Sequence, residues 1–323
     1  MKQHLRDLLG PLAALAAVYA IFWLLAPQSF LTLGNQKTLL VQATVVAVGA
    51  VGMTYVIVCG GIDLSVGSVM ALSAVVAALV TRAGGGNALA ALAGLGTGLG
   101  VGLVNGTLVG VLRIAPFIAT LGTMGAARGL AKGLAGERSV YPPDDWQSSF
   151  MAATPEPGWL LAAPGVWTAV ILAVIAGLAL RRTVAGTWVY AVGSSERTAL
   201  LCGIPVRRTK VAVYAFSGAC AGLGGVLLFH RLGTGDPTAA LGRELDVVAA
   251  VVVGGAALSG GEGGMLGSMI GTLLMAALAN GANLVDIPAL EVRGIPTWVQ
   301  EIGVGAIIVA AVWMDRRRAA ART

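Results

Sequence analysis

Long apolar runs, separated by short polar or charged interruptions, make up most of this 323-residue chain. A helix needs about 20 apolar residues to cross a bilayer, so we divide the runs at charges, prolines and Gly-Gly pairs. This division predicts an all-α, multi-pass membrane protein with about ten transmembrane helices in a single domain, 1–323. The expected helices are 11–31, 39–59, 65–82, 88–112, 116–134, 163–180, 211–230, 244–259, 264–285 and 297–314. The boundaries around 60–65 and 254–264 have few charges to mark them.

Composition agrees with a membrane protein. Hydrophobic residues make up 57% of the chain and charged residues 11%, whereas a soluble domain of this length needs a far more charged surface. The 47 glycines favour closely packed helices, because small residues let helix backbones approach each other in lipid. The first apolar run has no A-x-A type cleavage site near its end, so we expect a retained helix instead of a signal peptide.

Basic residues indicate the orientation in the membrane, since cytoplasmic loops are enriched in Lys and Arg. With a cytoplasmic N-terminus, 13 of the 21 basic residues fall inside: Lys2, Arg6, Arg113, Arg181, Arg182, Arg197, Arg207, Arg208, Lys210, Arg316, Arg317, Arg318 and Arg322. The other eight fall outside or near outer helix ends: Lys37, Arg82, Arg128, Lys132, Arg138, Arg231, Arg243 and Arg293. We therefore expect an even number of spans, with both termini and the basic loop 181–210 in the cytoplasm.

A regular glycine stripe runs along the expected helix 88–112. Its five members are Gly94, Gly98, Gly102, Gly106 and Gly110. Four residues exceed one helical turn by about 40°, so these positions form a slowly winding groove that another helix can approach closely. The partner is either a helix of the same subunit or a helix of another subunit.

Two interruptions share the pattern Gly-Gly-x-x-Leu-Ser, at 60–65 and at 254–259. Non-helical backbone at membrane depth is tolerated only where protein or water satisfies its polar groups, so we expect both turns to face the protein interior. Asp63 is either an N-cap of the following helix or a pathway residue. Polar or small residues considered for a translocation path or gate are Gly60, Gly61, Asp63, Ser65, Asn105, Asn280 and Asn283. The three asparagines are equally consistent with interhelical hydrogen bonding.

The chain offers little for catalysis. It has no Gly-Lys pair and hence no phosphate loop, no G-x-G-x-x-G turn, no H-E-x-x-H and no G-x-S-x-G. Cys59, Cys202 and Cys220 are odd in number and widely spaced, which indicates neither a disulfide framework nor a metal site. The outer segment 135–162, with Asp144, Asp145 and Trp146, either joins two helices or helps to bind an external partner.

Four segments resemble the permease subunits of bacterial ABC importers, in the ribose/xylose/galactose branch. They are AVGSSERTALLCGIP at 191–205, GGIDLSVGSVMALSAVVAA at 60–78, NGTLVGVLRIAPFIATLGTM at 105–124, and VVAAVVVGGAALSGGEGGMLGSMIGTLLMAALANG at 247–281. The resemblance covers about 40–314, and GGIDLSVGS is its most specific part. Family members usually have Asn and Ala where this chain has Ser194 or Ser195 and Arg197 or Thr198.

The resemblance implies a multi-pass subunit of the bacterial inner membrane with the type II importer fold, carrying a monosaccharide. It implies three partners: a second permease copy or paralogue, an ATPase subunit with two nucleotide sites, and an extracytoplasmic sugar-binding protein. No enzymatic activity and no cofactor are expected in this chain, since ATP and Mg are used by the ATPase. The alternatives are an importer for branched-chain amino acids or nucleosides, or a secondary transporter.

The resemblance also implies that a short helix near 195–203 couples the ATPase to the spans. Ser194, Ser195 and Glu196 can cap such a helix, and Gly203 can end it in a left-handed conformation. We expect Ala199, Leu200 and Leu201 to form a small apolar face toward the ATPase. The expected coupling residues are Ser195, Glu196, Arg197, Thr198, Ala199, Leu200, Leu201, Gly203 and Ile204.

Overall fold

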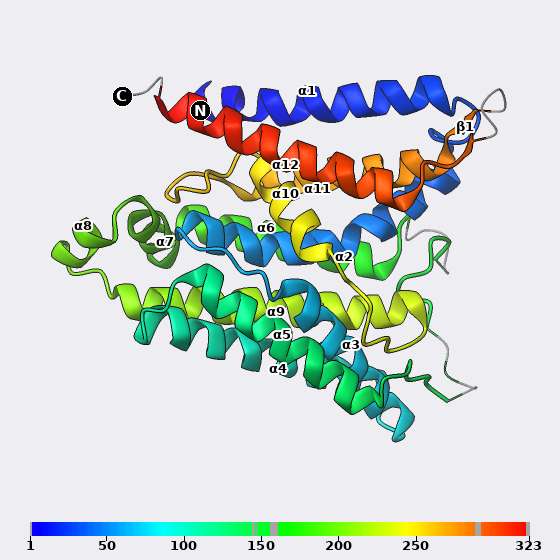
Figure 1. The fold of residues 1–323 in the computed structure, drawn as a ribbon, viewed down its shortest axis with the longest axis horizontal. Helices are drawn as coiled ribbons and strands as arrows, with labels where there is room; N and C mark the ends of the chain where they lie inside the picture. The colour runs from blue at the N-terminus through cyan, green and yellow to red at the C-terminus, as the bar shows by residue number, and fades with distance from the viewer. Residues whose placement is uncertain (1, 144–145, 147, 156–160, 288–291, 321–323) are drawn as a thin grey trace.

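The computed structural model describes residues 2–143, 146, 148–155, 161–287 and 292–320. Over these described residues, the regular secondary structure is helical apart from one short β-hairpin (Figure 1). Its helices are α1 (Lys2–Leu25), α2 (Leu33–Val58), α3 (Val66–Arg82), α4 (Asn87–Gly106) with a π-helical turn η1 (Thr107–Val111), α5 (Pro116–Ala135), α6 (Pro164–Arg182), α7 (Val184–Ser194), α8 (Glu196–Leu201), α9 (Val206–Leu232), α10 (Arg243–Val253), α11 (Met265–Leu284) and α12 (Thr297–Ala320). The hairpin pairs β1 (Asp286–Ile287) with β2 (Val292–Arg293).

Six helices of the described chain are long and apolar enough to cross a membrane. They are Leu8–Leu25, Leu33–Val58, Asn87–Val111, Pro164–Arg182, Val206–Leu232 and Met265–Leu284. Shorter apolar helices occur at Val66–Arg82 and Thr297–Ala310. The sequence therefore predicted a polytopic helical membrane protein correctly, and length and composition support six of the ten expected spans.

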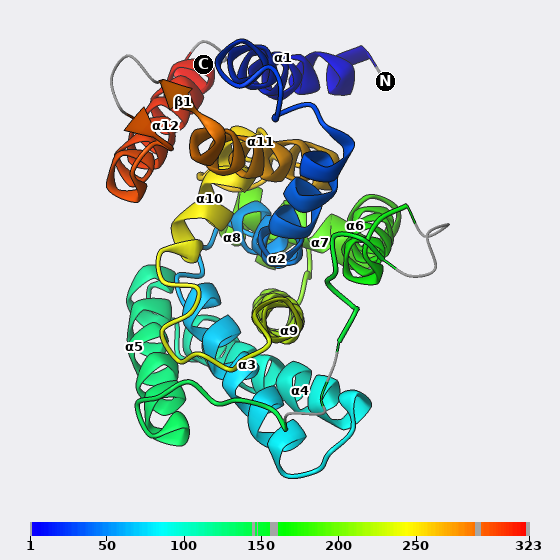
Figure 2. The same ribbon diagram turned by 90° about the vertical axis from the view of Figure 1, so that its right-hand side faces the viewer.

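The central helices are α2 and α9. Along α2 most side chains are buried, with Val48, Met53 and Ile57 fully enclosed. Figure 2 shows α9 end-on between α2, α3 and α4, with α5 and α6 at opposite edges of the molecule. Lipid tails are as apolar as the helices, so no hydrophobic driving force brings the helices together. Close van der Waals packing therefore has to stabilise this arrangement.

All five glycines of the stripe lie against α9 of the same chain. Gly98 contacts the backbone of Gly218 and Gly222, and Gly102 contacts the carbonyl oxygen of Tyr214. At these two positions a Cβ atom would collide with backbone, which cannot move aside as a flexible side chain can. The groove is therefore filled within the subunit.

Several expected boundaries are wrong. The first helix ends at Leu25, because Ala26 to Thr32 form hydrogen-bonded turns that contain Pro27. The helix expected over 244–259 ends at Val253, where Gly254 and Gly255 break it. The basic segment 181–210 is largely helical, because α7 occupies its first half and α9 begins at Val206.

The first residues of α1 and the last residues of α12 lie at the same end of the molecule as α7 and α8 (Figure 1). We call this the α8 end. The β-hairpin lies at the opposite end, where an isolated bridge also pairs Val140 with Gly235. The two termini therefore share one end with the basic segment.

We predict that Gly102→Leu strongly reduces the yield of folded protein, because the inserted side chain would separate α4 from α9. Overpacking of a well-packed interior costs about 1–3 kcal/mol or more. Gly100→Leu is the matched control, since nothing lies within 4 Å of a Cβ at that position of the same helix. Monodisperse yield and melting temperature are the measurements; equal values for both variants would contradict close packing at the groove.

Candidate functional site

The first helix interruption, 59–65, joins α2 to α3 through a tight turn. Gly60 has φ +82°, a conformation that favours glycine. The amide nitrogen of Gly61 donates to the Val56 carbonyl oxygen at 2.9 Å, and its Cα lies beside the Tyr214 ring. The turn is thus held by α2 on one side and α9 on the other.

The second interruption, 254–264, joins α10 to α11. Gly255, Gly260, Gly261 and Gly263 all have positive φ values between +77° and +142°. Gly254 packs directly on the backbone of Gly267 in α11, so no side chain fits between the two elements. Glycine therefore fixes the path of the chain here, as it does in the first interruption.

Both interruptions meet the segment that leads into α8. The amide nitrogen of Gly261 donates to the Val58 carbonyl oxygen at 2.9 Å. A Cβ on Gly193 would collide with that same carbonyl, and one on Gly260 would lie 2.8 Å from the Cα of Gly60. We call Val58, Gly60, Gly193, Gly260 and Gly261 the glycine junction. It brings the end of α2, the last turn of α7 and the loop between α10 and α11 into direct backbone contact.

A tyrosine adds a second connection between α7 and the second interruption. The hydroxyl of Tyr190 donates to the Gly263 carbonyl oxygen at 2.8 Å. Burial raises the pKa of this hydroxyl, with Arg181 acting in the opposite direction, so Tyr190 stays protonated and remains a donor at physiological pH. Sequence reasoning missed Tyr190, because one tyrosine in a basic segment gives no sign of its partner.

Asp63 is almost completely buried and accepts three hydrogen bonds. Its Oδ1 accepts from the Ser65 amide at 3.0 Å and from the Ser65 hydroxyl at 2.6 Å, and its Oδ2 accepts from the Ser217 hydroxyl at 3.1 Å. The amide bond gives Asp63 the geometry of a local turn just before α3. The N-cap residue of α3 is Ser65, so the expectation that Asp63 is itself the N-cap is wrong. The hydroxyl of Ser217 on α9 links Asp63 to a second helix, which a local turn alone does not require.

The hydrogen-bond network continues from Ser65 toward α5. Asn105 is fully buried; its Nδ2 donates to the Ser65 hydroxyl oxygen at 2.9 Å, and its Oδ1 accepts from the Thr123 hydroxyl at 2.7 Å. Each donor in this series points back toward Asp63: the Thr123 hydroxyl, the Asn105 amide and the Ser65 hydroxyl. The network therefore fixes the amide orientation of Asn105 and ends at a half-buried threonine on α5.

The other two asparagines lie away from this network. Asn280 forms two reciprocal bonds with Asn35, at 2.9 Å and 3.1 Å, and Asn283 accepts from Gln300 at 2.9 Å. Asn35 lies in the first turn of α2, and Asp63 follows the other end of this helix. The 26 residues of α2 span about 39 Å. The structure thus groups Asp63, Ser65 and Asn105, and places Asn280 and Asn283 in separate interhelical pairs.

The short helix expected near 195–203 is observed as α8, Glu196–Leu201. The Ser195 hydroxyl accepts from the Thr198 amide at 3.2 Å, and Gly203 ends the helix with φ +78°. The hydroxyls of Ser195 and Thr198 lie 2.9 Å apart, and Ile204 follows in the turn that closes on the Ala199 carbonyl. Arg197 is exposed.

One expectation about the apolar face of α8 is wrong. Ala199 is only 3% exposed and faces the interior of this chain, whereas Leu200 and Leu201 are 55% and 82% exposed. A helix of six residues presents one side to its own protein, and Ala199 occupies that side. Glu196 is also engaged within the chain, since it pairs with Lys210 of α9 at 2.6 Å.

The outer segment contains an aromatic cluster on α9. Trp146 stacks on Phe229 with ring centroids 4.8 Å apart, and its indole nitrogen donates to Asn87 at 2.8 Å. The Ser148 hydroxyl lies 2.5 Å from Nδ1 of His230. Asp144 and Asp145 lie outside the described residues. Trp146 thus anchors this segment to the helical body, as a connecting role requires.

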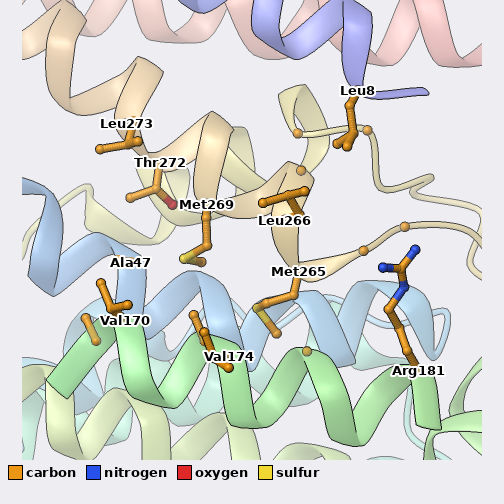
Figure 3. A pocket seen from close by; sticks show the side chains of 18 of the residues that line it. Leu8, Ala47, Val170, Val174, Arg181, Met265, Leu266, Met269, Thr272 and Leu273 are labelled. Atoms are coloured by element: carbon orange, nitrogen blue, oxygen red, sulfur yellow. The ribbon is translucent and has the colours of Figure 1, made fainter. Parts of the chain in front are cut away.

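A cavity of about 1390 Å³ opens between α1, α2, α6 and α11. Val170 and Val174 of α6 face Met265 and Met269 of α11 across it (Figure 3). Its lining contains none of Asp63, Ser65 or Asn105. Sugar recognition requires convergent polar groups, so this apolar space is not suited to a sugar.

Comparison with known proteins identifies a family and several relatives. The family described as branched-chain amino acid transport system permease component matches residues 35–312. The ribose import permease protein RbsC of Bacillus subtilis is 39% identical over 97% of this chain and 94% of its own length. The D-allose transport system permease protein AlsC of Escherichia coli K12 is 35% identical over 96% of this chain and 92% of its own length.

A third relative is the probable ABC transporter permease protein YphD of Escherichia coli K12. It is 35% identical over 97% of this chain and 90% of its own length. No solved structure matches the chain.

We predict that Asp63→Ala destabilises the fold and that Asp63→Asn does not. Alanine leaves the buried donors of Ser65 and Ser217 without an acceptor, which costs about 1–3 kcal/mol. Asparagine keeps one acceptor for Ser65, and its amide can donate to Ser217. Melting temperatures of the two variants in detergent are the measurement, with Glu301→Ala, at an exposed position of α12, as control. Equal melting temperatures for Asp63→Ala and wild type would contradict a structural role for this network.

Proposed function

The chain belongs to the family of branched-chain amino acid transport system permease components, and we propose that it carries a monosaccharide across the bacterial inner membrane in an ATP-driven importer. The observation that carries this proposal is full-length similarity to permeases named for ribose and D-allose. The rival substrates are branched-chain amino acids, named in the family description, and nucleosides. Uptake of radiolabelled ribose, allose, leucine and adenosine, each measured in competition with the others, distinguishes these substrate classes.

Energy enters through an ATPase subunit that binds at α8. Leu200 and Leu201 are large apolar side chains exposed on a short helix at the basic end of the molecule. Such a helix fits an apolar groove on a partner. The glycine junction then gives motion of α8 a direct mechanical route to α2 and to the 254–264 interruption, because the backbones touch with no flexible side chains between them.

Ten spans require four further helices in addition to the six long ones. These would be α3, α5, α10 and α12. An even count would put both termini and the 181–210 segment on one side, and their common location at the α8 end supports this (Figure 1). The basic residues of that end support a cytoplasmic location for it.

Asp63 acts as a gate residue in addition to holding the start of α3. The Ser217 and Asn105 connections support this role, because they join the first interruption to α9 and α5. Uptake by Asp63→Asn, which keeps the hydrogen-bonding geometry but removes the charge, measures the role separately from folding. Wild-type uptake by this variant would restrict Asp63 to a structural role in the turn before α3.

A second permease copy packs on α5 and completes the path. Four glycines of α5 have nothing within 4 Å of a Cβ: Gly122, Gly125, Gly129 and Gly133. Exposed apolar residues flank them, among them Ile118 and Leu130. Small residues on an open helix face favour close helix association in lipid. The extracytoplasmic sugar-binding protein binds the opposite end from α8.

We predict that Leu201→Asp abolishes ATPase binding while the permease still folds. Leu201 is 82% exposed, so the charge is solvated in the free chain but buried unpaired at the contact, which costs several kcal/mol. Val184→Asp, at a 66% exposed position of α7 outside α8, is the matched control. Co-purification of the ATPase and sugar uptake are the readouts. If Leu201→Asp retains both, α8 is not the coupling helix.

We also predict that a cysteine at Gly129 forms a disulfide between two permease copies in a background without Cys59, Cys202 and Cys220. Apposed α5 helices would bring two such residues within bonding distance. A cysteine at Gly96 is the control, because this glycine is equally open but lies on α4. Crosslinking from Gly96 and none from Gly129 would place the interface elsewhere.

A further inference from the structure

The cavity between α6 and α11 has a strongly apolar middle. Alkyl side chains from α2, α6 and α11 line it, and its two threonines have no free hydroxyl hydrogen. Thr44 donates to the Leu40 carbonyl at 2.8 Å, and Thr272 donates to the Ser268 carbonyl at 2.9 Å. An apolar cavity without free donors is not a stable site for water. The cavity is therefore suited to hold a hydrocarbon chain.

The cavity also opens toward the membrane. Val170, Val174 and Leu178 line it and are 45%, 54% and 53% exposed on a helix of membrane-spanning length. Exposed valine and leucine on such a helix contact acyl chains. Lipid tails therefore have lateral access to the space, whereas a polar solute does not.

Polar groups gather at the α8 end of the cavity. Arg181 extends from the last turn of α6 toward the second interruption (Figure 3). The acidic lining residue, Glu262, is already engaged in an interaction within the chain. The Tyr190 hydroxyl is committed to Gly263. Arg181 therefore supplies the positive charge of this end, and its planar guanidinium matches a phosphate group.

We propose that this cavity binds an anionic phospholipid of the leaflet at the α8 end. One acyl chain lies between α6 and α11, and the phosphate contacts Arg181. Charge complementarity selects the headgroup, and the apolar lining holds the chain. Because the cavity borders the 254–264 interruption, the lipid supports the face of the glycine junction that the protein leaves open. This inference depends on the chain being a membrane permease and not on the sugar it carries.

The test compares lipids added to the delipidated permease in detergent. Dioleoylphosphatidylglycerol should raise the melting temperature at about tenfold lower concentration than dioleoylphosphatidylcholine. Arg181→Gln should remove that tenfold preference, which corresponds to about 1.4 kcal/mol. Arg182→Gln is the matched control, since Arg182 is the adjacent exposed arginine but does not line the cavity, and it should keep the preference. Glycerol phosphate, which has the headgroup charge without chains, should not stabilise any variant.

A filling variant tests the acyl site independently. Val174→Trp places a large side chain in the cavity at an exposed position and should weaken stabilisation by both lipids at least fivefold. Native mass spectrometry should show fewer retained phospholipids for this variant. Equal stabilisation of wild type by the two lipids, equal loss in Arg181→Gln and Arg182→Gln, or unchanged lipid retention in Val174→Trp would overturn the proposal. If Arg181→Gln does not fold, the same lipid measurements on Arg181→Lys and Val174→Trp test the proposal.

Discussion

Direct contact between three backbones at the glycine junction is the constraint on which the rest of this structure depends. Inside a membrane, a broken helix leaves polar groups that lipid cannot satisfy. Here the two breaks solve this problem partly through each other, since the Gly261 amide bonds the Val58 carbonyl. That bond requires close backbone approach, which needs glycine at Gly193 and Gly260, whereas Gly60 needs glycine for its positive φ. The short helix α8 sits immediately after Gly193, so its position is tied to both breaks.

The sequence predicted those features that local patterns determine. Both Gly-Gly interruptions and the glycine groove follow from residue spacing, the short helix after Ser195 is implied by the family resemblance and agrees with capping chemistry, and all are present. Boundaries failed where a tertiary contact decides them. The helix expected through 259 ends at Val253, because Gly254 packs on Gly267 of another helix. The Gly254-Gly255 pair marks a turn in the sequence, but only the contact with Gly267 fixes the helix end at Val253.

The same limit explains the errors at the site. Ala199 was expected to face a partner, but the side of α8 that faces inward depends on how α7 and α9 hold it. Asn105, Asn280 and Asn283 look alike in the sequence, yet only Asn105 belongs to the Asp63 network. The other helical members of that network, Ser217 and Thr123, gave no sequence signal, because single hydroxyl residues are common in membrane helices. Distances between helices, and not residue types, separate these roles.

The shortness of α10 has a consequence for solvation. Its 11 residues rise about 16 Å, roughly half of a 30 Å hydrocarbon core. The helix therefore cannot cross such a core alone, and the turns on either side of it must supply the remaining length of any crossing. Backbone in those turns lacks helical partners, so it requires surrounding protein or water instead of lipid. The buried side chains of Val247 to Val252 show that protein surrounds α10 itself.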